Sequence, residues 1–306
     1  MRFNSVQLLG IAAGSGAGNP GAEDGPDALR ELGLVDRLVD AGFSVNDLGD
    51  IPGGHETHYE NAPAEFSKNI PEVLQVNRHT YAAVRNARRS GGDDTFLLIT
   101  GGDHSLAIGT LAGLADSCER LGLLWIDAHA DFNTPYTSPS GNIHGMSLAV
   151  ACGRGHHELR AIAESEPMIE DDDVHLFGCR DLDAGEIENL DDSDVHLLVM
   201  EDWRKAGIVA SVLAAAKRLS ETCDHVHMSF DIDVIDPGFV PGTGTPVAAG
   251  LTADEASTLL KELGSLGVLG SAEVVEYNPT LDTDGRPTGN LTRDLIVTLL
   301  TASKSG

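Results

Sequence analysis

Short apolar runs alternate with stretches of helical periodicity along this chain. Runs typical of strands cover residues 6–12, 96–100, 123–126, 174–177, 195–200, 226–230 and 269–275. Continuous apolar runs of this length are typical of strands buried on both faces of a parallel sheet. Helices are expected at about 106–120, 209–219, 253–263 and 291–301, with Thr252 as a cap. The pattern predicts one α/β domain over residues 1–306, with an open, doubly wound, mostly parallel sheet and helices on both faces.

Two carboxylates and an imidazole follow the apolar run 123–126. They are Asp127, His129 and Asp131, spaced two residues apart. In an extended strand, alternate residues share one face, so the three side chains would point the same way. The carboxyl ends of strands in an open α/β sheet are also where ligands bind. An acidic surface turn is the alternative interpretation of this segment taken alone.

Two further segments place similar residues after predicted strands. His104 follows a Gly-Gly pair after the run 96–100, and the glycines would let the chain turn tightly. Asp103 or Ser105 would cap the helix that follows. Asp231 and Asp233 end the run 226–230 and would share a face. Alone, His104 would equally fit a structural histidine, and Asp-x-Asp is a weak signal.

Together the three segments supply two histidines and four carboxylates. That is more than one zinc site uses, and it suits two divalent ions that share bridging carboxylates. Imidazole and carboxylate ligands fit manganese, zinc or iron. Two such ions, about 3.5–4 Å apart, make water a nucleophile near neutral pH. The residues therefore predict a dinuclear hydrolytic centre.

These motifs, in this order and spacing, resemble the ureohydrolases, the family of arginase, agmatinase and formiminoglutamase. The resemblance runs from about residue 18 to residue 279 and rests on Gly-Gly-Asp-His-Ser, Asp-Ala-His-Ala-Asp and Ser-Phe-Asp-Ile-Asp. It implies a three-layer α/β/α fold and two Mn²⁺ ions per subunit. By resemblance, Asp127 and Asp231 would bridge the ions, His104 and Asp131 would complete one, and His129 and Asp233 the other.

Segments beyond the metal motifs are most similar to those of arginase. The resemblance assigns the α-carboxylate of the substrate to Asn133, Ser140 and Asn142, whose amides and hydroxyl suit an anion. It assigns the α-amino group to Asp183, with Glu186 nearby. From the residues alone, these segments are a polar loop and an acidic helix start. A site with these partners should reject agmatine, which would leave buried polar groups unpaired.

The resemblance also implies the residues of the reaction. Glu276, with Thr245 beside it, would hold the guanidinium, because two carboxylate oxygens fit its forked donors. Asp131 would steady a metal-bridging hydroxide, and Asp131 or His144 would pass a proton to the leaving amine. The expected reaction converts L-arginine to L-ornithine and urea. The alternatives are the same chemistry on agmatine, guanidinobutyrate or formiminoglutamate, and an inactive regulator that binds arginine or ornithine.

Two positions depart from the arginase pattern. Asp254 stands where arginases often carry the arginine of a subunit contact, and Tyr277 stands where many have valine. A homo-oligomer, trimer or hexamer, is still expected by resemblance.

The remaining histidines are interpreted as structural or surface residues: His55, His58, His79, His156, His157, His175, His196, His225 and His227.

The formal net charge of −28 argues against nucleic acid or an anionic membrane as a partner. Only 5 of the 20 basic residues are lysines, and abundant carboxylates with scarce lysine suggest a halophilic source, where salt screens self-repulsion.

The cysteines are interpreted as reduced core thiols of a cytoplasmic protein: Cys118, Cys152, Cys179 and Cys223. The first residues fit a strand better than a signal peptide, and residues 52–69 are expected to form a long polar loop or a short-helix region near the site.

Overall fold

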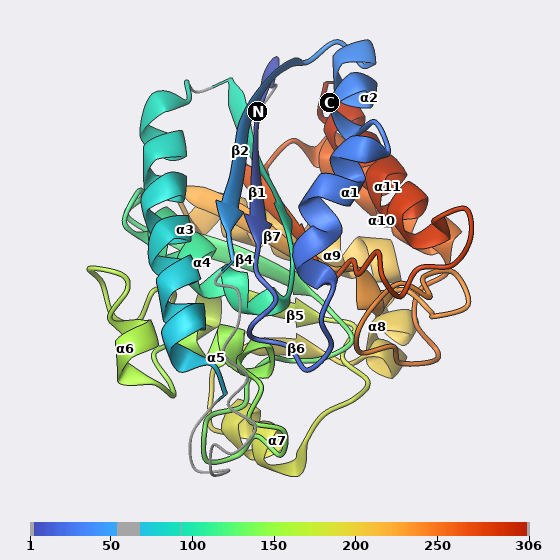
Figure 1. Cartoon of the computed structure of the whole chain (residues 1–306). Helices are drawn as coiled ribbons and strands as arrows, with labels where there is room; N and C mark the ends of the chain where they lie inside the picture. The colour runs from blue at the N-terminus through green and yellow to red at the C-terminus, as the bar shows by residue number, and fades with distance from the viewer. Residues whose placement is uncertain (1–2, 54–67, 93, 305–306) are drawn as a thin grey trace.

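The apolar runs form one central sheet in the computed structural model, which describes residues 3–53, 68–92 and 94–304 (Figure 1). Eight parallel strands lie in the order β2-β1-β3-β8-β7-β4-β5-β6. Their bounds are β1 (Ser5–Ala12), β2 (Ser44–Pro52), β3 (Thr95–Gly101), β4 (Leu121–Ile126), β5 (Val174–Phe177), β6 (His196–Leu198), β7 (His225–Asp231) and β8 (Ser271–Val275). The predicted single-domain parallel sheet is confirmed.

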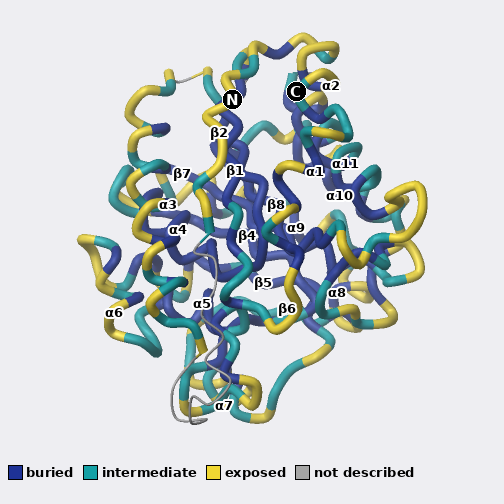
Figure 2. The backbone as a smooth tube through the Cα atoms, viewed as in Figure 1, coloured by how far each residue is buried: buried dark blue, intermediate teal, exposed yellow. Residues whose placement is uncertain are grey.

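Helices cover both faces of the sheet (Figure 1). One face packs against α3 (Ile70–Ser90), α4 (Ala107–Ala115) and α5 (Ser147–Ala151). The other packs against α1 (Gly25–Glu31), α2 (Leu34–Asp40), α9 (Ile208–Thr222), α10 (Ala253–Leu266) and α11 (Pro287–Ser303). The remaining α-helices are α6 (His157–Arg160), α7 (Ala184–Asp191) and α8 (Met200–Ala206). Figure 2 shows the resulting pattern, a buried sheet inside helices whose outer surfaces are exposed.

Alternation within the strands explains why the apolar runs are continuous. Along β3, Phe96 and Leu98 enter the core beneath α11, whereas Leu97 and Ile99 enter the core beneath α3. Burial of each such side chain stabilises the fold by about 1.5–3 kcal/mol. Because helices cover both faces of the sheet, neither set of alternate side chains in β3 faces solvent. The strand therefore lacks the apolar–polar alternation of a half-exposed strand.

Two long elements escaped the sequence analysis. β2 is an edge strand that pairs only with β1, and most of its residues are exposed. An edge strand with exposed side chains lacks the apolar run that identifies its neighbours, so β2 carried no signal. α3 was not predicted either. Of the loop expected over residues 52–69, residue 52 belongs to β2 and residues 54–67 lie outside the described part of the chain.

Two predicted bounds need correction. The helix expected over 106–120 ends at Ala115, where Ser117 Oγ and Cys118 Sγ hydrogen-bond to carbonyls four residues back and so satisfy the helix end. The strand expected over 195–200 covers only His196–Leu198, since Met200 already begins α8. The caps are confirmed at Thr252 and at Asp103, which accepts from Ser105 N at 2.8 Å.

Other sequence-level expectations have mixed outcomes. Cys152 and Cys179 are buried free thiols, but Cys118 and Cys223 are only half-buried, so the description as core thiols holds for two of the four. Within the described ranges, no helix is both long and apolar enough to cross a membrane. His55 and His58 lie outside the described residues.

Candidate metal centre and active site

The candidate ligands gather at the carboxyl edge of the four central strands, β3, β8, β7 and β4. His104 follows β3, residues 127–131 follow β4, and Asp231 is the last residue of β7. Glu276 follows β8. After β3 the chain crosses to the other half of the sheet, where β4 lies, so the strand order changes direction. A change of direction of this kind opens a crevice beyond the carboxyl ends of the strands. Segments more than a hundred residues apart are thereby brought together.

Local turns, rather than strand alternation, point the aspartates inward. β4 ends at Ile126, so Asp127, His129 and Asp131 lie in a loop and not in an extended strand as expected. The Asp127 carboxylate accepts from His129 N at 2.7 Å, and Asp131 has a left-handed φ of 51°, which costs about 1–2 kcal/mol. Asp233 lies in a 3₁₀ turn and its N–H donates to Asp231 at 2.8 Å. Both expectations of a shared strand face are therefore wrong.

His104 reaches the crevice through a close backbone contact. A Cβ atom on Gly102 would lie 1.7 Å from the carbonyl oxygen of Ala13, so only glycine fits at this position. The His104 ring then stacks on Trp125, with ring centroids 4.0 Å apart. The same indole donates from Nε1 to Asp127 at 3.0 Å. The tight turn and the stacking fix the imidazole in the crevice.

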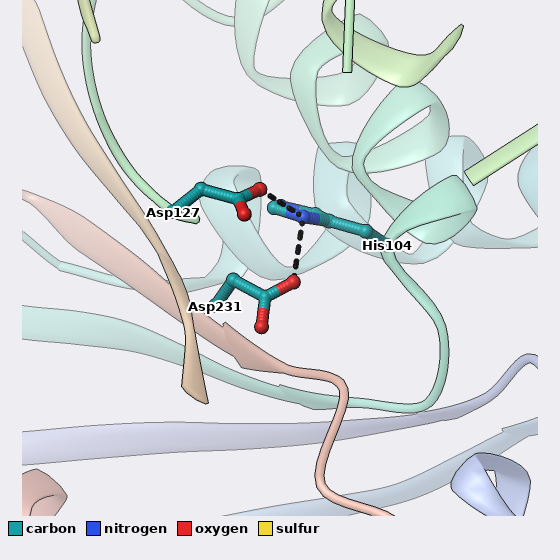
Figure 3. Close-up of side chains that lie close together, drawn as sticks. All are labelled: His104, Asp127 and Asp231. Carbon is teal, nitrogen blue, oxygen red and sulfur yellow. Dashed lines mark ion pairs between the residues drawn. The ribbon is translucent and has the colours of Figure 1, made fainter. Parts of the chain in front are cut away.

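Six side chains converge there: two triads that share Asp127, and Asp131 beside them. His104 Nδ1 lies 3.1 Å from Asp127 Oδ2 and 3.2 Å from Asp231 Oδ2 (Figure 3). His129 Nδ1 lies 3.1 Å from Asp233 Oδ2 and 3.5 Å from Asp127 Oδ1. Asp131 Oδ2 is a further neighbour of His104 Nδ1, at 3.2 Å. Asp127 thus belongs to both triads and presents one oxygen to each.

These residues fit a pair of divalent cations. His104 Nδ1 and Asp131 Oδ2 are buried, yet neither has a hydrogen-bond partner among the described residues. Two ligand atoms held about 2.1 Å from one ion at a right angle lie about 3 Å apart, which matches the distances around His104 Nδ1. Buried ligand atoms without hydrogen-bond partners are better satisfied by a shared metal ion than by contact with one another.

The charge balance supports the same interpretation. Burial lowers the pKa of His104, but Asp127, Asp131 and Asp231 outweigh burial and raise it well above its usual value. Burial and the neighbouring Asp233 raise the pKa of Asp231. Carboxylates that crowd together in a buried site need compensating positive charge, from protons or from metal ions.

A cavity of about 210 Å³ opens onto the triads. Its lining combines His104, His129, Asp131 and Asp231 with rim residues from the loops: Asn133, Ser138, Ser140, Asn142, His144, Gly145, Asp181, Asp183, Glu186 and Thr245. Within this lining, as far as the described residues show, there is no lysine or arginine. The cavity therefore suits a small cationic or zwitterionic ligand.

Glu276 lies behind this cavity rather than along its wall. It is buried, has a left-handed φ of 64°, and does not belong to the lining. Its Oε1 accepts from His104 N at 2.8 Å and lies 2.9 Å from His144 Nδ1. Burial lowers the pKa of His144, but Glu276 outweighs burial and raises it to about 9. Thr245, expected beside Glu276, donates to Asp233 Oδ2 at 3.0 Å.

The predicted substrate residues form the rim. Asn133 Nδ2 donates to Asp183 Oδ2 at 2.9 Å, which places the carboxylate-binding and ammonium-binding candidates side by side. Glu186 accepts from Phe132 N at 2.8 Å, and its pKa is raised to about 8, chiefly by burial. Ser140 accepts from Asn142 N at 3.2 Å in the neighbouring loop. All the predicted rim residues line the same cavity.

Several residues at the site were not singled out from the sequence. Asp181 and Ser138 also line the cavity, and the exposed Lys68 donates to Asn142 at its mouth, at 3.3 Å. Beneath the crevice, Ser229 Oγ lies 2.7 Å from His104 Nε2. Ser229 precedes Asp231 by two positions in β7, so the strand period of two was the signal that would have identified it.

A parallel sheet with six candidate imidazole and carboxylate ligands at its carboxyl edge, beside a polar cavity, is the arrangement expected of a metal-dependent hydrolase. Comparison with known proteins agrees. The family model "Arginase family" matches residues 4–302, and the chain belongs to this family. Arginase of Bacillus caldovelox is 39% identical over 277 residues, covering 90% of this chain and 92% of that relative. Arginase of Bacillus subtilis (strain 168) is 39% identical over 296 residues, covering 97% of each.

Solved structures extend the comparison. The Bacillus caldovelox arginase superposes with a TM-score of 0.91 at 38% identity, covering 97% of this chain and 98% of that one. Formimidoylglutamase from Bacillus subtilis superposes over 99% of this chain and 88% of its own, with a TM-score of 0.78 at 20% identity, and shares the fold.

Proposed function

We propose that this protein hydrolyses the guanidinium group of L-arginine to L-ornithine and urea, with two Mn²⁺ ions. The observation that carries the proposal is the pair of triads sharing Asp127, which opens onto a cavity rimmed by both carboxylate-binding and ammonium-binding groups. Among curated relatives, those named arginase match along almost the whole chain. The two ions would supply an activated water for attack on the guanidinium carbon.

The chain's own residues bind and orient the substrate. Asp183 and Glu186 would accept the α-ammonium group, and Asn133, Ser140 and Asn142 would donate to the α-carboxylate. Asn133 and Asp183 are hydrogen-bonded to each other. This closeness suits their proposed roles, because the α-carboxylate and the α-ammonium group are attached to the same carbon atom. Fixing this end of the substrate directs its guanidinium toward the triads.

Proton movement is assigned to the pair formed by the half-buried His144 and the buried Glu276. Glu276 Oε1 already contacts His104 N and His144 Nδ1, so Glu276 would meet the guanidinium through its other oxygen, Oε2. His144 lines the cavity and would give a proton to the leaving amine. Asp131, which also lines the cavity, would hold the attacking oxygen in line by accepting a hydrogen bond from it.

Urea release from purified, Mn²⁺-loaded protein in molar salt tests the proposal, with L-arginine and agmatine compared at equal concentrations. Urea from L-arginine and little or none from agmatine is the expected result, because agmatine lacks the α-carboxylate and leaves the rim unpaired. Urea from agmatine alone would contradict the rim assignment. No urea from either substrate, with two metal ions bound, would contradict the proposed activity.

We also propose that the protein is a cytoplasmic homo-oligomer from a halophilic source. The net charge of −28 supports the last point, since such a surface repels itself without screening. The melting temperature should rise as potassium chloride is added to dilute buffer, and full stability in dilute buffer would contradict the proposal. Sedimentation in molar salt measures the subunit number.

A further inference from the structure

A line of buried polar side chains runs from the crevice back through the middle of the sheet. Along β7, His225, His227 and Ser229 alternate with Val226, Met228 and Phe230, which fill the core on the other face. On β8, Ser271 pairs with His227 and Glu273 pairs with Ser229. These five polar side chains are all buried: His225, His227, Ser229, Ser271 and Glu273.

Short contacts join this line to the metal centre. Ser229 Oγ lies 2.7 Å from His104 Nε2 and donates to Glu273 Oε1 at 2.7 Å. Farther from the crevice, Ser271 Oγ lies 2.8 Å from His227 Nδ1 and 2.7 Å from His225 Nε2. Glu273 Oε1 and His227 Nε2 are 3.8 Å apart. The metal-ligand candidate His104 is thus two hydrogen bonds away from a buried carboxylate.

The buried carboxylate of Glu273 is costly for the fold alone. An ionised carboxylate costs several kcal/mol to bury unless it is fully paired, and Glu273 Oε2 has no hydrogen-bond partner among the described residues. Burial raises the pKa of Glu273, but the nearby His227 imidazole, 3.8 Å away, and the hydrogen bond from Ser229 outweigh burial and keep the pKa below its usual value. An apolar side chain in β8 would avoid this cost, as Ala272 and Val274 do on the opposite face.

The direction of the hydrogen bonds follows from Glu273. A carboxylate only accepts, so the single proton of the Ser229 hydroxyl must point to Glu273. The Ser229 oxygen can then only accept from His104, which places a proton on His104 Nε2. The neutral imidazole keeps its lone pair on Nδ1, the atom that faces Asp127, Asp131 and Asp231.

We propose that Glu273 is a positioning residue for the metal centre. Acting through Ser229, it holds His104 in the tautomer that presents a lone pair to the ion on the His104 side, and it makes that imidazole a stronger ligand. The inference rests on the proposed metal centre but not on the identity of the substrate. No equivalent support is needed at His129, whose side chain is 24% exposed and faces the cavity.

The two halves of the centre should therefore respond differently when Glu273 is changed. Removing its acceptor lets the Ser229 hydroxyl donate to His104 instead, which favours the tautomer with a proton on Nδ1. The ion on the His104 side then competes with that proton, whereas the ion bound by His129 and Asp233 does not. General loosening of the sheet would weaken both ions together.

The experiment titrates metal-free protein with Mn²⁺ and follows binding by calorimetry and electron paramagnetic resonance. Glu273→Met is similar in length but has no carboxylate acceptor. It should weaken the binding of one of the two ions about 10–100-fold and give the signal of an isolated Mn²⁺. Glu273→Gln keeps a carbonyl oxygen for Ser229 and should retain the coupled two-ion signal. His225→Asn, at the far end of the same buried line, is the matched control and should bind both ions as the wild type does.

Two further measurements keep the test decisive. Circular dichroism and melting of each metal-free variant show whether it folds, and Ser229→Ala should reproduce the selective loss if Glu273→Met does not fold. Wild-type affinity for both ions in Glu273→Met and Ser229→Ala, or an equal weakening of both ions, would overturn the proposal. Two ions bound without urea release from L-arginine would instead contradict only the proposed function.

Discussion

The crevice at the carboxyl edge of the sheet and the outer edge at β6 both combine two histidines with aspartate. The crevice cluster consists of His104, His129, Asp127, Asp131, Asp231 and Asp233. The edge cluster consists of His175, His196, Asp172 and Arg218. In the edge cluster, the two imidazoles stack with centroids 4.5 Å apart, and Asp172 lies 3.0 Å from His196 Nε2. Residue types alone would not separate the two clusters.

Charge balance and burial do separate them. In the edge cluster, Arg218 contacts Asp172 at 2.9 Å and both imidazoles, so the aspartate already has a permanent cation. In the crevice cluster, four carboxylates face two histidines, and His104 is almost fully buried. The comparison teaches that residue types alone do not mark a candidate metal site: a surplus of buried negative charge distinguishes the crevice cluster, and Arg218 removes such a surplus in the edge cluster.

Replacing Asp231 by asparagine should break the crevice cluster and have the largest effect. Metal-ion catalysis contributes several kcal/mol, so urea release should fall by at least about a thousandfold, with fewer than two ions bound. The metal-free variant should melt at a higher temperature than the metal-free wild type, because one crowded carboxylate is gone. Metal content, urea release and melting measure the three effects. A lower melting temperature of the metal-free variant would contradict the claim that excess negative charge destabilises the metal-free crevice.

Glu276→Gln should separate metal binding from catalysis within the crevice. The variant keeps the shape of the side chain but loses the charge that faces His144 and the guanidinium. We expect two bound ions and a fall in kcat/KM for L-arginine of roughly 100–1000-fold, the size of losing one preorganised electrostatic contact. Loss of metal together with activity would mean that Glu276 supports the triads rather than the substrate.

Asp183→Ala should affect the choice of substrate without affecting the metals. Removing a charged hydrogen-bond acceptor costs about 1.5–3 kcal/mol, which corresponds to roughly a 10–100-fold lower kcat/KM for L-arginine. Guanidinobutyrate lacks the α-amino group, so its kcat/KM should change little. Steady-state kinetics with both substrates measure the difference. An equal fall for both substrates would remove Asp183 from the ammonium site.

The edge cluster should contribute a small, pH-dependent stability and no activity. Burial, with His196 and Arg218 nearby, lowers the pKa of His175 to about 4, from 6.5. The unfolded chain therefore binds the extra proton first, so this stability is complete above pH 6.5 and falls as the pH drops toward 4. After allowance for solvent screening at this half-buried residue, the change is about 1 kcal/mol.

His175→Asn removes this pH dependence. The difference in unfolding free energy between wild type and variant, measured by urea denaturation at pH 7.5 and pH 4.5, should change by that amount, while His79→Asn on the exposed face of α3 should not change it. Urea release from L-arginine should be unaffected by either substitution. A loss of activity in His175→Asn would mean that the two clusters are coupled.

The sheet was predictable because its signal is local. β5 coincides with its predicted run, and β1, β3, β4, β7 and β8 extend by one or two residues beyond theirs or fall slightly short. Strands buried on both faces are mostly apolar, apart from the buried polar side chains of β7 and β8, so the sequence carries the signal in a few adjacent residues. β2 escaped because an exposed edge strand is under no such requirement.

The candidate site was predictable in its members but not in its geometry. The strand period was applied to residues 127–131, where the chain has already left the strand, and was not applied to His225, His227 and Ser229, where it holds. From the sequence, His225 and His227 are interpreted singly, as structural or surface residues, and Ser229 is given no role of its own. Their common face in β7 was the signal that connects them to His104.

The sequence by itself determined the strands, the ligand types and the positions of the ligands after strand ends, because these depend on neighbouring residues. Tertiary structure decided what the ligands do. The strand order brings β3, β4, β7 and β8 together, the turns at Asp131 and Glu276 aim side chains against backbone preference, and Glu273 meets Ser229 only across the β7–β8 pair. Contacts between residues far apart in the chain have no local pattern, so only the folded chain reveals them.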